Sequence, residues 1–354
     1  MNERTEHAMN STPGDGRPTT YDVVVIGGGA AGLSGALTLG RARRSVLVVD
    51  AGQPRNAPAH GVHAYLGHEG TPPGELLATG RAEVRRYGGE FRAGRATGAE
   101  RVGDGFRVTL ADGERLRARR LLVTTGLVDE LPDVPGLAEL WGSDVLHCPY
   151  CHGWEVRDQA IGVLGTGPLA VHQALLWRQW SADVTLFLHT MDEPDEQQYE
   201  ELAARGVGVV TGEVAALETR DGRLHGVRLA SGELMMRQAL AVATKLVPRA
   251  GVLAPLGLEP VDLEIAGAVV GAHIAADPFG ATEVPGVWVA GNVASPMDQV
   301  VAAAAAGVRA GAALNADLVA EETRRAVEAR REPFSAQMER EVCEVVLGER
   351  RHGL

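Results

Sequence analysis

The fold is decided by residues 21–32, which read YDVVVIGGGAAG. The first half, 21–26, places four β-branched apolar residues in succession, as is typical of a parallel strand buried on both faces. An intact GxGxxG follows at 27–32, then a helix of small residues, and a second apolar run at 46–49 ends on Asp50. Together these elements predict a dinucleotide-binding fold, with a pyrophosphate at the helix N-terminus and ribose hydroxyls on the acid.

The same pattern returns later in the chain. Residues 161–164 read as a strand, 165–170 form a GxGxxA turn, a helix spans 171–180 and a second strand spans 184–188. The position that corresponds to Asp50 is the end of this last strand, where the residue is Leu188. No carboxylate therefore stands there for a ribose, and no arginine for a 2′-phosphate.

Two further features of this second copy disfavour a phosphorylated nucleotide. Pro168 removes a backbone N–H from the turn that would hold the pyrophosphate. A group of acids just after the second strand would repel a 2′-phosphate. These acids are Asp192, Glu193, Asp195 and Glu196.

The last third of the chain returns to the first domain. Residues 286–292 read as a strand that runs into a turn, and 296–300 open an alanine-rich helix to about Leu318. The N-terminus of this helix could face a bound cofactor, although good helix propensity alone also explains the segment. We therefore predict an α/β fold with two Rossmann-like dinucleotide-binding domains, the second inserted in the first. The expected bounds are 1–20 for a disordered tail, 21–127 and 248–320 for the first domain, 128–247 for the second, and 321–354 for a C-terminal helix and tail.

Cys148 and Cys151 are two of only three cysteines in 354 residues. Two residues between cysteines let both sulfurs sit at the first turn of a helix, where a disulfide can form and the dipole lowers the thiol pKa. Zinc would need two more ligands and no second CxxC supplies them, so we predict no metal site. A disulfide across so short a loop constrains little of the unfolded chain, so redox chemistry is the favoured interpretation. Cys343 has no near partner and is interpreted as an inert thiol.

Composition excludes several classes of partner. The chain has a mass of 37.3 kDa and 45% hydrophobic residues, which suffices for two domains, and no apolar run is long enough to span a bilayer. A net charge of −12 argues against nucleic acid or an anionic membrane as partner. The polar first twenty residues lack the apolar core of a signal peptide. We therefore expect a cytoplasmic protein, where a CxxC is more often catalytic than structural.

Residues 51–56, AGQPRN, open a loop rich in Gly, Pro and His that runs to Gly74. Such a loop beside a nucleotide could wrap the far end of a cofactor, with Arg55 and Asn56 as hydrogen-bond donors. An ordinary surface loop has the same composition.

These motifs together resemble the low-molecular-weight thioredoxin reductases. They are GGGAAG at 27–32, CPYC at 148–151, the second glycine turn, AGN at 290–292 and PMDQV at 296–300, and the resemblance covers about residues 20–320. It implies that the first domain binds FAD, that the second is an NAD(P)-binding-like domain carrying the cysteines, and that the chain forms a homodimer. It also implies that Cys151 faces the flavin and that Cys148 exchanges with substrate.

The residues expected to contact FAD come from both segments of the first domain. They are Gly27, Gly29, Ala31, Gly32, Asp50, Gly52, Gln53, Arg55, Asn56, Gly126, Gly291, Asn292, Gln299 and Val300.

The chain departs from the reductases after the second fold. They carry a His-Arg-Arg run where this chain has His189-Thr190-Met191, and they have Asp where Asn292 stands. The string CPYCHGWE at 148–155 looks more like the branch that oxidises dithiols of small natural products, such as the gliotoxin, holomycin and romidepsin disulfide-forming oxidases. In that branch electrons pass from a substrate dithiol through the CxxC to FAD and then to dioxygen, giving hydrogen peroxide.

The chemistry requires a base, because a substrate thiol must lose its proton before it attacks the disulfide at Cys148. His147 is a candidate base near neutral pH. The resemblance to the oxidases suggests an acidic partner for it, and we expect this to be Asp277. Because neighbouring residues on a strand point to opposite faces, His147 could instead be a surface histidine.

The favoured function is thus an FAD-dependent dithiol oxidase with a redox-active disulfide, acting on a small-molecule dithiol. Two alternatives stay open. One is a thioredoxin reductase-like disulfide reductase that uses NADH, ferredoxin or an unusual mode of NADPH binding. The other is a non-catalytic flavoprotein that senses redox state through the CxxC.

Overall fold

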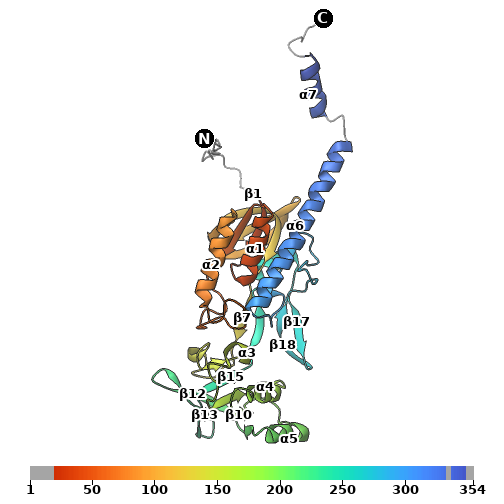
Figure 1. Ribbon diagram of the computed structural model, residues 1–354. Coiled ribbons are helices and arrows are strands. Elements are labelled where there is room, and N and C mark those ends of the chain that lie inside the picture. The colour runs from red at the N-terminus through yellow and green to blue at the C-terminus, as the bar shows by residue number, and fades with distance from the viewer. Residues whose placement is uncertain (1–19, 332–335, 348–354) are drawn as a thin grey trace, which may run out of the picture.

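The computed structural model describes residues 20–331 and 336–347. The predicted tail, 1–20, lies outside these residues except for Thr20, which begins the first strand. Figure 1 shows one sheet with α1, α2 and α6 in one part of the molecule and a second sheet with α4 and α5 in the other, with β7 and α3 between them. Among the described residues, no helix has both the length and the apolar character needed to cross a bilayer.

The first sheet has seven strands in the order β3-β2-β1-β6-β5-β4, with β19 paired to β6. The strands next to β1 run parallel to it, whereas β4, β5 and β6 pair in antiparallel fashion. The bounds are β1 (Thr20–Ile26), β2 (Val46–Asp50), β3 (Glu90–Ala93), β4 (Ala96–Val102), β5 (Gly105–Leu110), β6 (Arg115–Val123) and β19 (Val287–Val289). The helices that accompany this sheet are α1 (Ala30–Arg41), α2 (Pro73–Arg86) and α6 (Val300–Arg331).

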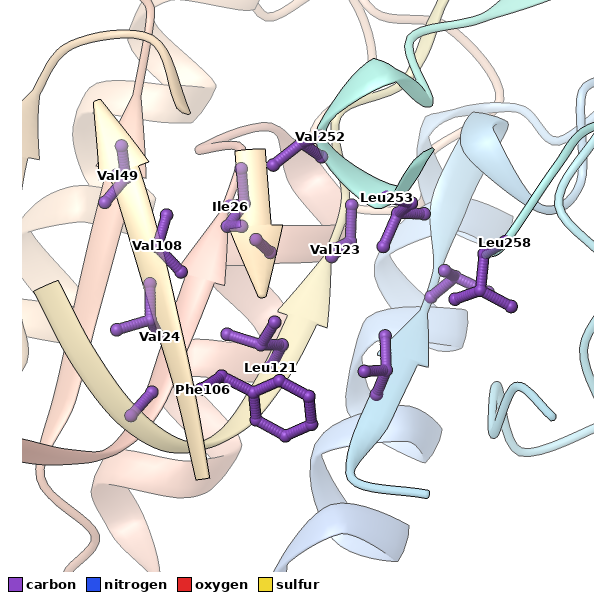
Figure 2. Packing of buried hydrophobic residues seen from close by; sticks show 14 of the residues in the cluster. Val24, Ile26, Val49, Phe106, Val108, Leu121, Val123, Val252, Leu253 and Leu258 are labelled. Atoms are coloured by element: carbon purple, nitrogen blue, oxygen red, sulfur yellow. The ribbon is translucent and has the colours of Figure 1, made fainter. Parts of the chain in front are cut away.

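Strand β1 is buried on both faces, as its unbroken apolar run predicts. Val24 and Ile26 belong to a core shared with the 3-10 helix η2 (Gly251–Leu256), whose Val252 and Leu253 contribute to it (Figure 2). Val23 and Val25 point to the other face, where α1 and α6 pack. Each buried valine or isoleucine contributes about 1.5–3 kcal/mol of transfer free energy, so this strand anchors the sheet.

Helices α1 and α6 pack with their backbones in close contact because glycines stand where they meet. A Cβ built on Gly307 of α6 would lie 2.0 Å from the carbonyl oxygen of Ala31 in α1. One built on Gly311 would lie 2.9 Å from the carbonyl oxygen of Gly35. Only glycine therefore fits at Gly307.

Helix α6 is longer than predicted, because it continues to Arg331 where the sequence suggested an end near Leu318. It also begins at Val300, later than the predicted opening at 296. Neither glycine nor proline interrupts 312–331, and ion pairs fix this part of the helix to β6. Arg120 of β6, which is 9% exposed, reaches Asp317 and Glu321 at 2.6 Å each. A separate helix, α7 (Ala336–Leu347), follows in the C-terminal region.

A four-stranded sheet in the order β17-β18-β16-β7 links the two parts of the chain. Strand β7 leaves the first sheet and β16 returns to it, and the two pair in antiparallel fashion. The bounds are β7 (Leu127–Glu130), β16 (Lys245–Pro248), β17 (Val261–Ile265) and β18 (Ala268–His273).

The second Rossmann-like sheet is fully parallel, in the order β11-β10-β9-β15-β8. Its strands are β8 (Val145–Leu146), β9 (Ile161–Leu164), β10 (Val184–Phe187), β11 (Gly208–Val210) and β15 (Ala239–Val242), and its helices are α3 (Pro149–His152), α4 (Ala170–Trp177) and α5 (Glu196–Ala204). A three-stranded antiparallel sheet lies beside it, made of β12 (Val214–Arg220), β13 (Arg223–Leu229) and β14 (Leu234–Met236). Two short 3-10 helices, η1 (Ala138–Leu140) and η3 (Gly291–Val293), complete the described elements. The predicted α/β class with two nested Rossmann-like sheets is confirmed.

The contact between α1 and α6 yields a first prediction. Gly307→Ala forces the two helices apart, so we expect it to lower the free energy of unfolding by about 1–3 kcal/mol, the usual range for overpacking. Urea denaturation followed by circular dichroism measures this loss.

The matched control is Gly74→Ala in helix α2. A Cβ at this exposed position meets nothing within 4 Å, so alanine should leave stability unchanged or raise it slightly. If the two variants had equal free energies of unfolding, the close packing of α1 on α6 would not contribute to stability as expected.

Candidate functional site

A cavity of about 550 Å³ joins the first glycine turn to the two cysteines. It is lined by both segments of the first sheet region and by the residues after β8. Most of the predicted site residues line it: Gly27, Gly29, Ala31, Asp50, Gln53, Arg55, Asn56, Gly126, His147, Cys148, Cys151, Gly291, Asn292, Gln299 and Val300. The structure therefore brings together residues that lie as much as 273 positions apart, from Gly27 to Val300.

The glycine turn presents bare backbone to this cavity. Helix α1 has Gly29 as its N-cap, no side chain caps its first turn, and a Cβ at Gly29 would meet open space. Gly27 has a φ of +111°, and a side chain there would collide with Thr124. The first N–H groups of the helix are thus free to bind an anion at the cavity wall.

Two of the predicted contact residues lie outside the cavity wall. Gly32 is one of them, and its Cβ would lie 1.9 Å from the carbonyl oxygen of Gly27, so glycine permits the close packing of the turn. Gly52 is the other, and it adopts a φ of +70° in the turn after β2. Their contact with FAD stays a prediction.

Arginines that the sequence did not single out surround the same end of the cavity. Arg81 of α2 pairs with Asp50 at 2.8 Å, and the other oxygen of Asp50 accepts a bond from the N–H of Gly28. Arg95 donates to the side chain of Gln53, and Arg249 donates to its carbonyl oxygen. These groups fit a dinucleotide such as FAD. The free N–H groups and the arginines suit its anionic pyrophosphate, and the carboxylate at the end of β2 suits the hydroxyls of its ribose.

The turn before α6 closes the other end of the cavity. The side-chain amide of Asn292 donates to the carbonyl oxygens of Ser295, Pro296 and Asp298, so it shapes the turn that precedes the helix. This explains why α6 begins at Val300. Gln299 then points to the cysteines, with its Nε2 3.8 Å from the sulfur of Cys151.

The cysteines stand at the first turn of the short helix α3, as their spacing predicts. Cys148 is its N-cap and Cys151 lies in its only turn, where the N–H of Cys151 bonds to the carbonyl oxygen of Cys148 at 3.1 Å. Helix α3 follows β8 by two residues, so the second sheet determines where the sulfurs lie. Both cysteines are partly buried and unbridged in this structure.

The two thiols have different acidity. The S–H of Cys151 donates to the sulfur of Cys148 and, with backbone N–H groups, lowers the pKa of Cys148 to about 7, although burial opposes this shift. The same hydrogen bond and burial raise the pKa of Cys151. Cys148 is therefore the thiolate of the reduced pair near neutral pH.

His147 lies in the cavity wall beside an ion pair. The pKa of His147 is lowered to about 4, chiefly by burial and then by the charge of Arg55, while Asp129 opposes both. Arg55 binds Asp129 through two hydrogen bonds of 2.7 Å. For Asp129 itself, burial would raise the pKa, but the bonds from Arg55 and from Thr244 outweigh it and the pKa is lowered. His147 is a neutral ring at pH 7, and its role as a base stays a prediction.

The structure does not bring Asp277 to His147. Asp277 lines a different cavity, between the loop after β18 and α6, and its carboxylate accepts bonds from the N–H groups of Phe279 and Ala281. The acid beside His147 is Asp129, which sequence reasoning missed because only the pairing of β7 with β16 places it there.

The second glycine turn is packed tightly at its first glycine and open at its second. Thr190 and Met191 both donate their N–H groups to the carbonyl oxygen of Gly165, and the sulfur of Met191 would lie 2.6 Å from a Cβ on that glycine. A Cβ built on Gly167, the glycine at which a pyrophosphate would approach, meets nothing within 4 Å. The ring of His189 accepts a bond from the N–H of Val214, so it serves the local structure, and Asp195 caps α5.

Known proteins resemble this chain in sequence and in fold. The family model of the pyridine nucleotide-disulphide oxidoreductases matches residues 21–307. The crystal structure of HlmI is 48% identical, with a TM-score of 0.83 over 89% of this chain and 98% of that chain. The oxidoreductase from Agrobacterium tumefaciens is 38% identical, with a TM-score of 0.80 over 85% and 99% of the two chains. Thioredoxin reductase tcpT from Claviceps purpurea is 32% identical over 85% of this chain and 95% of that protein.

The hydrogen bond between the thiols yields a second prediction. In the reduced protein, the rate at which iodoacetamide alkylates Cys148 should be half-maximal near pH 7, because only the thiolate reacts. Cys151→Ala removes the donor, so the pKa of Cys148 should return toward its ordinary range and the rate at pH 7 should fall by about 15-fold. Mass spectrometry of the alkylated peptide gives the rate.

Cys343→Ala serves as the control, since Cys343 is exposed on α7. It should leave the midpoint for Cys148 unchanged. A midpoint that does not move in Cys151→Ala would show that Cys151 does not stabilise the thiolate.

Proposed function

Because the chain belongs to the pyridine nucleotide-disulphide oxidoreductase family and is a thioredoxin reductase-like enzyme, we propose that it is an FAD-dependent dithiol oxidase. It oxidises a small-molecule dithiol to a disulfide through Cys148 and Cys151 and passes the electrons to dioxygen. Segments 21–127 and 248–320 form the FAD-binding domain, and 128–247 form the NAD(P)-binding-like domain that carries the cysteines.

The shared cavity is the observation that carries this proposal. The Gly27–Gly29 turn and the sulfurs of Cys148 and Cys151 line the same 550 Å³ space, so a cofactor held by the turn extends toward the cysteines. When bound, FAD supplies a two-electron acceptor that dioxygen can reoxidise. The protein supplies a thiol pair of unequal acidity and Gln299 beside Cys151.

The residues around the second glycine turn support the direction of electron flow. A reductase needs a nucleotide to bring electrons, and the end of β10 offers it neither a carboxylate nor an arginine, because Leu188 stands there. The acids that follow, with Pro168 in the turn, add repulsion and remove a donor. A dithiol that brings its own electrons needs no such pocket.

A disulfide reductase is the second candidate. The names of the relatives favour it, because the chain matches nearly the whole length of proteins called thioredoxin reductase, including tcpT and sirT from Leptosphaeria maculans. In that case a nucleotide or another donor would reduce the flavin, and the cysteine pair would deliver electrons to a disulfide.

We also propose a homodimer. Its support is the exposure of apolar side chains at the second cavity and around the start of α6: Phe279 and Met297 are 58% and 61% exposed, and Val301 and Val308 of α6 are exposed as well. A second copy that covers this surface would bury it.

One assay separates the two functions and gives a third prediction. With dithiothreitol in air, the FAD-loaded protein should release one hydrogen peroxide per disulfide formed, because two electrons leave each dithiol and reduce one dioxygen. Cys148→Ser should abolish both products, since no disulfide remains to accept the thiolate. An oxygen electrode and a peroxidase-coupled dye follow the reaction.

The same sample, kept free of oxygen, receives NADPH or NADH in a separate cuvette. We expect the flavin absorbance to persist with either nucleotide and to bleach with dithiothreitol. Rapid bleaching by a nucleotide would favour the reductase and exclude the oxidase.

A further inference from the structure

The side-chain amide of Gln299 lies beside the sulfur of Cys151. Its Nε2 is 3.8 Å from that sulfur, and the residue lines the shared cavity directly before the first residue of α6. A neutral thiol sulfur accepts such a bond weakly, whereas a charged acceptor shortens and strengthens it. The contact therefore favours the thiolate form of Cys151 over the thiol and over the disulfide.

Arg55 brings a positive charge to the same cavity. Two hydrogen bonds of 2.7 Å to Asp129 fix its guanidinium group in the cavity wall. Its Nη1 also donates to the carbonyl oxygen of Pro296 at 3.4 Å, and Gln299 follows three residues later in the same turn. Arg55 thus holds the turn that carries Gln299 as well as supplying a charge.

Burial makes a thiolate at Cys151 costly, and these two residues oppose that cost. In the reduced pair the pKa of Cys151 is raised by its hydrogen bond to Cys148, by burial and by the charge of Cys148, whereas Gln299 and Arg55 lower it. When Cys148 is bonded to a substrate sulfur it carries neither proton nor charge. Of the causes that raise the pKa of Cys151, burial then remains, and Gln299 and Arg55 act against it.

Neighbouring titratable groups of the cavity wall do not supply a positive charge at pH 7. Burial lowers the pKa of His147 and of His152, so both rings are neutral. Asp298, next to Gln299, is a carboxyl group whose pKa burial raises, and in its ionised form it would repel a thiolate. Stabilisation of a charged Cys151 therefore depends on the amide and the guanidinium.

We propose that Gln299 stabilises the thiolate that Cys151 becomes when a substrate thiolate opens the disulfide at Cys148, and that Arg55 adds its positive charge to this stabilisation. The inference rests on the dithiol oxidase function proposed above. Gln299 is then a catalytic residue because it touches a reacting sulfur. Arg55, held by Asp129, is a positioning residue that acts through its charge and through the turn.

Opening of the disulfide transfers two electrons to the cysteine pair. One substrate thiol loses its proton to solvent, its sulfur bonds to Cys148, and the Cys148–Cys151 bond breaks with its electron pair on Cys151. The second substrate sulfur then bonds to the first, the bond from substrate to Cys148 breaks with its electron pair on Cys148, and the second thiol proton ends on Cys151. The substrate loses two electrons, and the pair gains them as one thiolate and one thiol.

The test measures the ionisation of Cys151 when it is the sole thiol of the pair. In the FAD-loaded Cys148→Ala protein, mass spectrometry follows the rate at which iodoacetamide alkylates Cys151 as a function of pH, and each rate is divided by its limit at high pH. Adding Gln299→Leu should raise the midpoint by about one pH unit, because the thiolate loses its hydrogen bond. Arg55→Gln should raise it by a similar amount, whereas Arg55→Lys keeps the charge and should raise it less.

Two controls accompany these measurements. Cys343, exposed on α7, is alkylated in the same samples, and its midpoint should be the same in all variants. Gln197→Leu, at an exposed position of α5 outside the cavity wall, should leave the midpoint of Cys151 unchanged.

A second measurement tests the use of this thiolate in the reaction. The oxidised protein with both cysteines undergoes a single turnover with dithiothreitol in the absence of oxygen. Gln299→Leu should lower its rate constant by roughly three- to tenfold, because a thiol of higher pKa leaves more slowly.

Equal midpoints for Cys151 with and without Gln299→Leu would overturn the inference. A midpoint that rises while the single turnover keeps its wild-type rate would overturn the catalytic role of Gln299. Midpoints that shift as expected in a chain whose wild-type form does not react with dithiothreitol would support the stabilised thiolate and overturn the proposed function.

Discussion

The contacts of Asp129 with Arg55 and Thr244 hold the two parts of this molecule together at the site. Arg55 belongs to the loop after β2, Asp129 to the strand that leaves the first sheet, and Thr244 to the turn before the strand that returns. Asp129 has a side chain that is 7% exposed, so loss of its partner would leave a buried charge and cost about 3–5 kcal/mol. The same pair stands beside His147 and acts on the acidity of Cys151.

Around this contact, each sheet contributes a different component. The first sheet and α1 present free N–H groups, and α6 begins where the Asn292 turn allows it to begin. The second sheet positions the cysteines. Strand β8 pairs with β15, and Cys148 follows the end of β8 by two residues. Strands β7 and β16 pair where the chain crosses between the two sheets. This crossing places the cysteines of the second sheet in the wall of the cavity that the first sheet also lines.

Local patterns predicted the elements, and long-range pairing decided what they could not predict. The apolar run of β1, the glycine turn and the CxxC helix are encoded in neighbouring residues, so they were predicted correctly. Strand pairing brings Asp129 to the site, and helix packing brings Arg81 there. Neither contact can be predicted from the residues next to it in the sequence. Asp277, expected beside His147, is bound in its own turn instead. Helix α6 continues past Leu318, where Glu321 pairs with Arg120 of β6. Helix propensity does not register this distant partner, so the predicted end of the helix was too early.

The second sheet has a consequence for how such a chain can be altered. Its acids and Pro168 disfavour a nucleotide, yet the same sheet fixes the cysteines through the pairing of β8 with β15. The inserted segment therefore cannot be shortened or deleted without moving the redox pair, whether or not it binds a ligand of its own.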